Sequence, residues 1–419
     1  MSAESRRGLL RGDSSGRRAI AIEMALAAVR AVDPVRVTRE AVADLRAHGE
    51  LPDAPVVIAL GKAAMGMARG AFDACRPRGG LLIGLDAVDL CGVPSLRAEH
   101  PVSGAIAIAN GEALLRLAET LGAGDTVLCL ISGGGSAMAE VPVLGVDASC
   151  LAATQEVLLA SGAPIGVVNA VRGRLSRLKN GGLLRALLPA RVITLVLSDT
   201  PHLSPAVVAS GPTAALPRSP SLEELLAMDD LVRRLPSAAF EALRRAGAER
   251  PTLAEAPRLV VAADNATAQR AAIAEAERHG LSAAPAPTAL SGQAHLAGAR
   301  LCREGRAADV DVLVSGGETT VVVRGQGRGG RSHELCLGGA SKLAGGLLVG
   351  FGTDGVDGTS GAAGAMIDEA IMDRASALGL DEGRALASND SAAYFARAEA
   401  QIVTGPTGTN VADLAFYFP

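Results

Sequence analysis

The stretch TVLCLISGGGSAMAE, Thr126 to Glu140, decides how the rest of the sequence is interpreted. Its first six residues are mostly β-branched or apolar, which predicts a strand buried on both faces of a sheet. Ser132, three glycines (133–135) and Ser136 follow, and the next residues tolerate a helix. A strand that runs through glycines into a helix gathers backbone N–H groups at the positive end of a helix dipole, so the stretch predicts an anion site. A tight turn without a ligand stays the alternative, although one glycine would suffice for it.

Composition indicates an α/β protein of two or three domains. The chain has 419 residues, and an average domain has about 150. Because aromatic residues make up only 2% of the chain and Trp is absent, the core has to be built from Ala, Val, Leu and Ile. A net charge of −4 argues against a global field that would attract nucleic acid or an anionic membrane.

The cysteines and the apolar runs predict a cytoplasmic location. Six cysteines are scattered without a CxxC pair or paired histidines, which is typical of free thiols in a reducing compartment. The basic N-terminal segment lacks the apolar centre of a secretory signal, and no apolar run reaches the roughly 18 residues of a membrane span. We therefore expect a soluble protein with no nucleic-acid and no membrane partner, and a homodimer stays open.

Two further predicted strands end in polar residues that suit a site. The strand 56–60 is followed by Lys62 and a helix, so this lysine is either a surface residue or a group that reaches a ligand cleft. The strand 190–200 ends in Asp199. This acid suits a metal ligand, a general base or a helix N-cap.

A basic segment, NAVRGRLSRLKNGG (169–182), is predicted to be helical. Positions 172, 176 and 179 are then expected on one face of the helix. The segment is either a solvated charge run or the lining of an anion cleft.

A second α/β unit is predicted beyond a change of domain near residues 235–255. There the strand 310–314 leads into SGGET (315–319), which repeats the strand-then-SGG pattern of the first stretch. In contrast to the first stretch, a second strand, Thr319–Arg324, is expected to follow.

The remaining segments continue the same alternation. A glycine loop carries Arg331 into a predicted helix. Within 347–368 we expect a strand, a loop with Asp354 and Asp357, and a helix of small residues. Two short strands within 401–418 are expected to rejoin a sheet.

Together these motifs favour phosphoryl transfer. That reaction needs backbone amides around phosphates, cations that hold charge, and acids for Mg²⁺, and five glycine loops here follow apolar strands. The P-loop pattern GxxxxGK[ST] is missing, and GxGxxG does not follow the first strand as a dinucleotide dehydrogenase would require. The nucleophile elbow and the HExxH zinc pattern are missing as well.

The same motifs, in the same order, resemble the class II glycerate 2-kinase family. The resemblance rests on GKA (61–63), CLISGGGSA (129–137), the 169–182 segment, LSDT with ASGPT (197–213), SGGETTVVV with GRGGR (315–331), GTDGVDG with AAGA (352–365), SNDS (388–391) and GPTGTNV (405–411). It implies a Rossmann-like three-layer domain over residues 1–245 and 400–419, and a smaller α/β domain of the MOFRL type over 246–399. The active site is then expected in the cleft between the domains.

The activity that the resemblance implies is ATP- and Mg²⁺-dependent phosphorylation of D-glycerate to 2-phosphoglycerate. A kinase for another sugar acid or oxo-acid, a hydroxypyruvate reductase (a name that some members carry) and an inactive nucleotide-binding paralogue are the alternatives. The family usually has His-Pro-x-Pro-Asp where this chain has HPVSG (100–104), and Gly-Gly-Arg-Asn-Gln-Glu where it has GGRSHE (329–334). Such changes suit an altered acceptor pocket.

By position, Lys62 and Arg331 resemble cations that clamp phosphate or stabilise the transition state, and Asp199 joins them as a catalytic candidate. The acids expected to bind Mg²⁺ are Asp199, Glu318, Asp354 and Asp357. Nucleotide or substrate binding is expected at Ser132, Gly133, Gly134, Gly135, Ser136, Asn169, Arg172, Lys179, Gly316, Gly317, Glu318, Asn389, Thr407 and Asn410.

Overall fold

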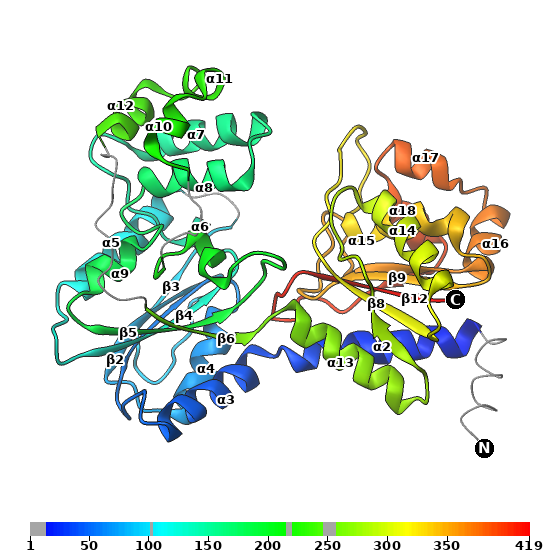
Figure 1. Ribbon diagram of the computed structural model, residues 1–419, viewed down its shortest axis with the longest axis horizontal. Coiled ribbons are helices and arrows are strands. Elements are labelled where there is room, and N and C mark those ends of the chain that lie inside the picture. The colour runs from blue at the N-terminus through cyan, green and yellow to red at the C-terminus, as the bar shows by residue number, and fades with distance from the viewer. Residues whose placement is uncertain (1–13, 101–103, 215–219, 246–256) are drawn as a thin grey trace. The chain divides into compact units, whose positions relative to one another are not determined.

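A computed structural model of the chain divides into two units (Figure 1). The structure describes residues 14–100, 104–214, 220–245 and 257–419. The described residues within 34–198 and 203–262 form what we call the parallel-sheet unit, and residues 14–33, 199–202 and 263–419 form the mixed-sheet unit. Among the helices in these ranges, none combines the length and the apolar character that a membrane span requires.

The parallel-sheet unit is built on a six-stranded sheet. Its strands are β1 Val56–Leu60, β2 Gly79–Gly84, β3 Ser95–Arg97, β4 Thr126–Ser132, β5 Arg191–Leu197 and β6 Arg258–Ala263. Their order is β3-β2-β1-β4-β5-β6, and β1 to β5 pair in parallel. This is the order of Rossmann-type sheets, in which ligands bind beyond the carboxyl ends of the two strands where the order reverses, here β1 and β4.

Helices cover both faces of this sheet. Figure 1 shows α3 (Pro34–Ala47) and α4 (Ala64–Ala74) on one face, with α5 (Ala105–Ala118) and α9 (Gly182–Leu187) on the other. Alternate strand residues, among them Ile58 and Cys129, form one core with leucines of α5 and α9. Continuous apolar runs in β1, β4 and β5 follow from burial on both faces, and the predicted three-layer fold is confirmed.

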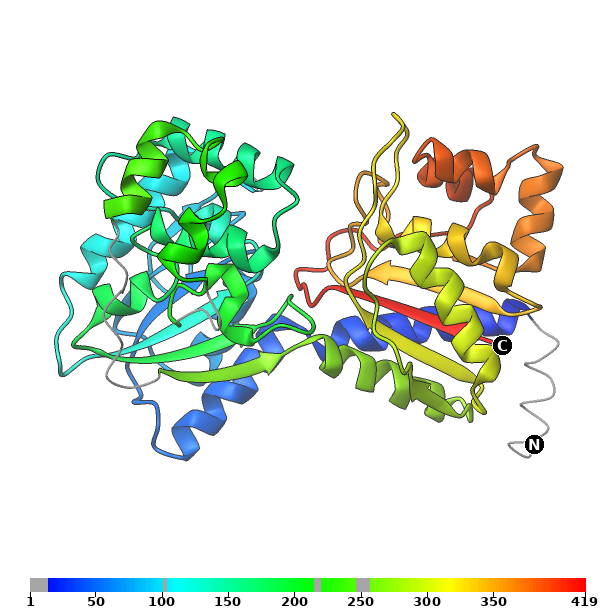
Figure 2. The same cartoon turned by 45° about the horizontal axis from the view of Figure 1, so that its top comes forward.

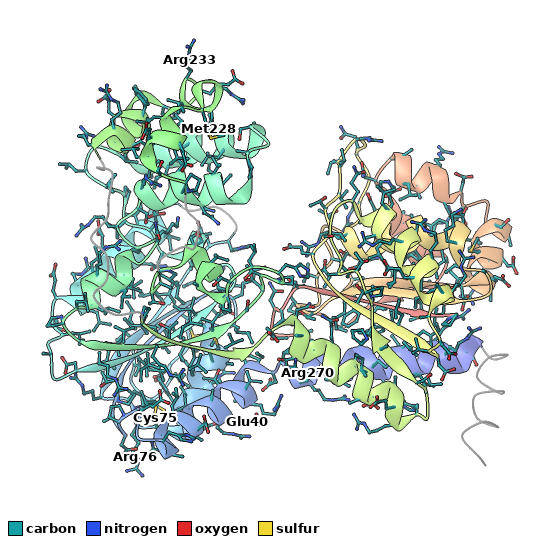
Figure 3. The ribbon with its side chains drawn as sticks, in the orientation of Figure 1. Glu40, Cys75, Arg76, Met228, Arg233 and Arg270 are labelled. Atoms are coloured by element: carbon teal, nitrogen blue, oxygen red, sulfur yellow. The ribbon has the colours of Figure 1, made fainter. Side chains whose placement is uncertain are left out.

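The same unit carries a helical cluster with a core of its own. It consists of α7 Ala148–Ala160, α8 Ile165–Arg174, α10 Leu222–Leu226, α11 Asp229–Val232 and α12 Ser237–Arg245. Leu158, Val171, Leu235 and Leu243 belong to its core, and Met228, labelled in Figure 3, packs against it. This core fixes one side of α8, the helix that begins the basic segment.

The mixed-sheet unit contains a second six-stranded sheet. Its strands are β7 Ala283–Pro285, β8 Val312–Gly317, β9 Leu347–Gly352, β10 Gly364–Ile367, β11 Gln401–Ile402 and β12 Asp413–Phe418, in the order β11-β10-β9-β12-β8-β7. Figure 2 shows α2 (Ser14–Ala31) and α13 (Asn265–Arg278) on one face, with α14 (Ala294–Ala307) and α15 (Arg331–Gly339) on the other. The short helices α16 Glu369–Ala377, α17 Glu382–Ala387 and α18 Ser391–Arg397 precede β11.

The predicted assignment of residues 400–419 to the Rossmann-like domain is wrong. β12 lies between β8 and β9 in the mixed sheet and is antiparallel to both. All six of its residues are buried, so a central position suits its apolar LAFYF run. The helix α2 also belongs to the mixed-sheet unit. The last stretch of chain in this unit begins at residue 263, whereas we expected the domain boundary at 245.

Two predicted elements of the mixed-sheet unit differ in type. Thr319–Arg324 forms no strand: Thr320 makes an isolated bridge with Gln293, and at the end of the segment the N–H groups of Arg324 and Gly325 donate to the Asn389 side chain at 2.6 and 2.9 Å. The small residues after Asp357 include β10, which pairs with β9, where we expected a helix.

The basic segment is helical only in its first part. α8 ends at Arg174, and the chain then runs beside residues 141–143: Arg177 N donates to Val141 O at 2.8 Å, and Val143 N donates to Leu175 O at 3.0 Å. Positions 172, 176 and 179 therefore do not share a helix face, contrary to the prediction.

Candidate active site

The loops after β1 and β4 are joined at the point where the strand order reverses. Lys62 N donates to Gly133 O at 2.9 Å, and Ala63 N donates to the Ser132 hydroxyl at 3.1 Å. Gly61 makes this approach possible: at φ +128°, a Cβ there would lie 2.4 Å from Ser132 O. The sequence-based pairing of Lys62 with a ligand-binding loop thus has a structural basis.

Gly134 leaves room for two side chains beside that loop. Its φ is +82°, and a Cβ there would lie 2.9 Å from Lys62 Cγ and 3.2 Å from His100 Cδ2. Burial lowers the pKa of His100, and the charge of Lys62 lowers it further, which favours the neutral imidazole. The helix that follows, α6 (Gly135–Met138), is a single turn, so the expected contribution of a helix dipole is small.

A second part of this site is a line of three polar side chains. Arg172, on α8, donates to the Ser136 hydroxyl at 2.9 Å, and Ser136 Oγ lies 2.9 Å from Ser210 Oγ. Ser210 was missed from the sequence. The ASGPT motif that contains Ser210 contributed to the family resemblance, but the sequence assigns no role to this serine, and the backbone shows that Ala209 and Ser210 both have left-handed φ values, 53° and 62°.

Lys179 forms a buried ion pair with Glu140. Its ammonium contacts Glu140 Oε2, and the Ser176 hydroxyl donates to Glu140 Oε1. Burial lowers the pKa of Lys179, and Glu140 acts in the opposite direction. The ligand-binding role of Lys179 stays a prediction, and the structure adds that its ammonium is paired with Glu140. Asn169, predicted together with Lys179, lies one turn before Arg172 on α8 and is partly exposed.

Asp199 lies two residues beyond the end of β5. The helix-cap alternative does not apply, because the following 3₁₀ helix begins at Pro205 and is capped by Ser204. Its roles as metal ligand or general base stay predictions.

In the mixed-sheet unit, Arg331 lies between two carboxylates. Its Nη2 donates to Asp413 Oδ1 at 3.0 Å, its Nε lies 3.0 Å from Asp413 Oδ2, and its Nη1 pairs with Glu318. Asp413, which the sequence did not single out, is 4% exposed and is opposite Gly317 and Gly352 in the sheet register. Burial raises its pKa to about 7, with Arg331 acting against the shift and Asp357 and Glu318 adding to it.

The four predicted Mg²⁺ ligands have different environments. Both oxygens of Asp357 accept N–H groups at the start of α15, from Ser332 and His333 at 3.0 and 2.9 Å, so Asp357 caps that helix. Asp354 and Asp413 both have an oxygen near Gly352: a Cβ on this glycine would be 3.1 Å from Asp354 Oδ1 and 3.5 Å from Asp413 Oδ1.

The carboxylates of Glu318, Asp354 and Asp413 are the oxygen donors that suit Mg²⁺. Within the described ranges, however, the set of ligand atoms already close enough for one ion is a different one, Glu23, Glu275 and His279 on α2 and α13.

The remaining predicted binding residues of this unit hold its loops. Asn389 donates to Glu334 Oε1 at 2.7 Å while it accepts from the loop at Arg324. Thr407 Oγ1 donates to Thr353 O at 2.6 Å, and Asn410 Oδ1 accepts from its own turn. Residues 101–103 of the altered HPVSG motif lie outside the described part of the chain.

Comparison with known proteins places both units in one family. The family described as "Domain of unknown function (DUF4147)" matches residues 20–244, and the MOFRL family matches residues 311–413. The D-glycerate 2-kinase of Thermotoga maritima is 33% identical, over 96% of this chain and 98% of its own length. An Agrobacterium vitis protein named "Putative hydroxypyruvate reductase" is 37% identical, over 87% of this chain and 88% of its own length.

A solved structure agrees with these relatives. The crystal structure of glycerate kinase from Thermotoga maritima matches with a TM-score of 0.85 at 32% identity, covering 96% of this chain and 99% of that one. Family models, sequence relatives and fold are consistent with the motifs gathered at the ends of β1 and β4. The chain belongs to the glycerate kinase/MOFRL family.

Proposed function

We propose that this protein is an ATP-dependent glycerate 2-kinase that transfers the γ-phosphoryl group to the 2-hydroxyl of D-glycerate. The products are 2-phosphoglycerate and ADP. The observation that carries the proposal is the joining of Lys62 to the SGGG loop, where Lys62 N donates to Gly133 O at 2.9 Å. A cation beside a glycine loop at the switch point of a Rossmann-type sheet provides the positioning and charge stabilisation on which phosphoryl transfer depends.

The proposed site contains cations for the phosphoryl group, carboxylates for Mg²⁺ and one candidate general base. Lys62 and Arg331 are the cations assigned to the transferring phosphoryl group. Glu318, Asp354 and Asp413 would hold Mg²⁺, which neutralises phosphate charge when bound. We keep Asp199 as the candidate that receives the proton of the attacking hydroxyl.

A reductase is the second candidate, because the Agrobacterium vitis relative carries that name. The turn between β1 and α4 argues against it. This turn reads GKAAMG (61–66), not the GxGxxG that lets a dinucleotide pyrophosphate approach the backbone.

A coupled assay of ADP release against three- to six-carbon hydroxy and oxo acids tests the proposal, with NAD(P)H absorbance followed in parallel. We expect ADP release with D-glycerate and none without an acid. If ADP were released only with a different acid, that acid would be the acceptor instead of D-glycerate. Turnover of NAD(P)H with hydroxypyruvate would show that the protein is a reductase and not a kinase. A homodimer and a cytoplasmic location belong to the proposal and are open to light scattering and cell fractionation.

A further inference from the structure

The line of Arg172, Ser136 and Ser210 in the parallel-sheet unit has more hydrogen-bond donors than acceptors. A guanidinium only donates, so the Ser136 oxygen accepts from Arg172 Nη2, at 2.9 Å. The two hydroxyl oxygens lie 2.9 Å apart, so one of the hydroxyls donates a hydrogen bond to the other. The proton of the second hydroxyl is then directed out of the pair, toward an acceptor.

The charges around this line favour an anion as that acceptor. Burial lowers the pKa of Lys179, the charge of Arg172 lowers it further, and Glu140 is the acid that acts to raise the pKa of both groups. Glu140 is taken up by its contacts with Lys179 and Ser176. Arg172 itself donates to a neutral hydroxyl, that of Ser136, so an anion beside its guanidinium would offset the cost of burying this charge.

The backbone at Ser210 is held in a costly conformation. Ala209 and Ser210 have left-handed φ values, and such residues cost about 1–2 kcal/mol each when they are not glycine. The turn is fixed from outside: Asn180 N donates to Ser210 O at 3.0 Å, and Gly181 N donates to Gly211 O at 2.7 Å. Strain of this kind concentrates at ligand sites, where the surrounding structure maintains it.

We propose that Arg172, Ser136 and Ser210 form the subsite for the carboxylate of the acceptor acid. The assignment rests on the proposed function and adds the substrate group that this part of the site recognises. The planar fork of an arginine offers paired N–H donors that match the two oxygens of a carboxylate, and a neighbouring hydroxyl adds a further donor. Arg172 and Ser136 are partly exposed, so a ligand can reach them. Ser210 is only 6% exposed and holds the Ser136 hydroxyl in place through their hydrogen bond.

The test compares Arg172→Lys with a matched control, Arg174→Lys. Arg174 is on the same helix, and its guanidinium donates instead to Ala170 O and Pro220 O, at 3.2 and 2.9 Å. Hydrogen bonds to charged groups contribute about 1.5–3 kcal/mol, so Arg172→Lys should raise KM for D-glycerate roughly ten- to hundredfold. KM for ATP should change by less than about twofold, and Arg174→Lys should behave as the wild type.

Ser210→Ala provides a second variant with a milder expected effect. Losing one neutral hydroxyl should raise KM for D-glycerate about three- to tenfold. Calorimetric titration with D-glycerate, and with glycerol as the analogue without a carboxylate, gives a readout that does not depend on turnover. The wild type should prefer D-glycerate, and Arg172→Lys should reduce this preference.

An unchanged KM for D-glycerate in Arg172→Lys would overturn the assignment. A rise in KM for ATP alone would also overturn it, since the subsite would then take a phosphate. If the wild type released no ADP, but Arg172→Lys still weakened D-glycerate binding, the subsite would stand and the proposed function would fail.

Discussion

The two SGG loops of the molecule follow similar buried strands but use their glycines differently. In the first loop, the space at Gly134 is taken by the side chains of Lys62 and His100. In the second, a Cβ on Gly316 would lie 1.9 Å from Asn265 Oδ1, and one on Gly317 would lie 2.2 Å from Leu290 O. The first loop leaves room for reactive side chains, and the second lets the chain pack against itself.

This difference explains why a glycine motif alone does not identify a ligand site. Side-chain atoms around Gly134 can shift when a ligand binds, whereas the carbonyl against Gly317 belongs to a fixed bridge, in which Glu318 N also donates to Leu290 O at 3.0 Å. In the second unit the groups to which we assign ligand contacts come after the loop, at Glu318, on β12, at Asp413, and in the loop after β9, at Asp354. The binding roles of Gly316 and Gly317 stay predictions, and the structure shows in addition that both glycines allow close packing.

The largest expected effect is on catalysis through the first loop. Lys62→Ala should lower kcat by about a thousandfold or more, because a positioned cation stabilises charge that develops in the transition state. Thermal unfolding should change little, since the lysine is partly exposed. Steady-state kinetics beside a calorimetric melt measures both, and Lys342→Ala, an exposed lysine in the other unit, is the control. Full activity in Lys62→Ala would remove the role that we assign to the first loop.

Replacing one glycine of each SGG loop by alanine should affect the two loops differently: mainly stability in the second loop and mainly activity in the first. Gly317→Ala forces a Cβ against a backbone carbonyl at φ +150°, so we expect a loss of about 3 kcal/mol in the free energy of unfolding. Gly134→Ala should cost only about 1–2 kcal/mol, for its positive φ, but should lower kcat because the new methyl group displaces Lys62. Urea unfolding and kinetics on both variants test the contrast, which would be refuted by equal stability losses.

A third prediction concerns the slope of stability against pH at Asp413. Its pKa of about 7 in the folded protein lies above the ordinary 3.8, so between these values the folded state holds a proton that the unfolded chain has released. The stability contributed by this group is therefore complete below about pH 4 and is lost as the pH rises through 7, by at most about 1.4 kcal/mol per pH unit.

Asp413→Asn should remove that slope, as measured by urea unfolding at a series of pH values. Asp373→Asn, which alters an exposed acid on α16, should leave the slope unchanged. A variant Asp413→Asn with the wild-type slope would show that the Asp413 carboxyl does not titrate in this range.

Much of the parallel-sheet unit could be predicted, because its central strands are short apolar runs and because β1 and β4 are neighbours in any Rossmann-type sheet. Lys62 and the SGGG loop follow from that pattern. Ser210 and Asp413 could not be found in the same way, since a left-handed φ and a buried carboxylate beside Arg331 arise from tertiary contacts. The same reason explains β12: its sequence shows an apolar strand, but not the sheet that accepts it.

The most direct test of the account is the identity of the phosphorylated product. Incubating the protein with ATP, Mg²⁺ and D-glycerate, followed by proton-coupled ³¹P NMR, should give a new phosphomonoester whose phosphorus couples to the single proton on C2. This is the signature of 2-phosphoglycerate, and Lys62→Ala should not produce it. A phosphorus coupled to the two protons on C3, or no new phosphomonoester with D-glycerate, would contradict the central claim.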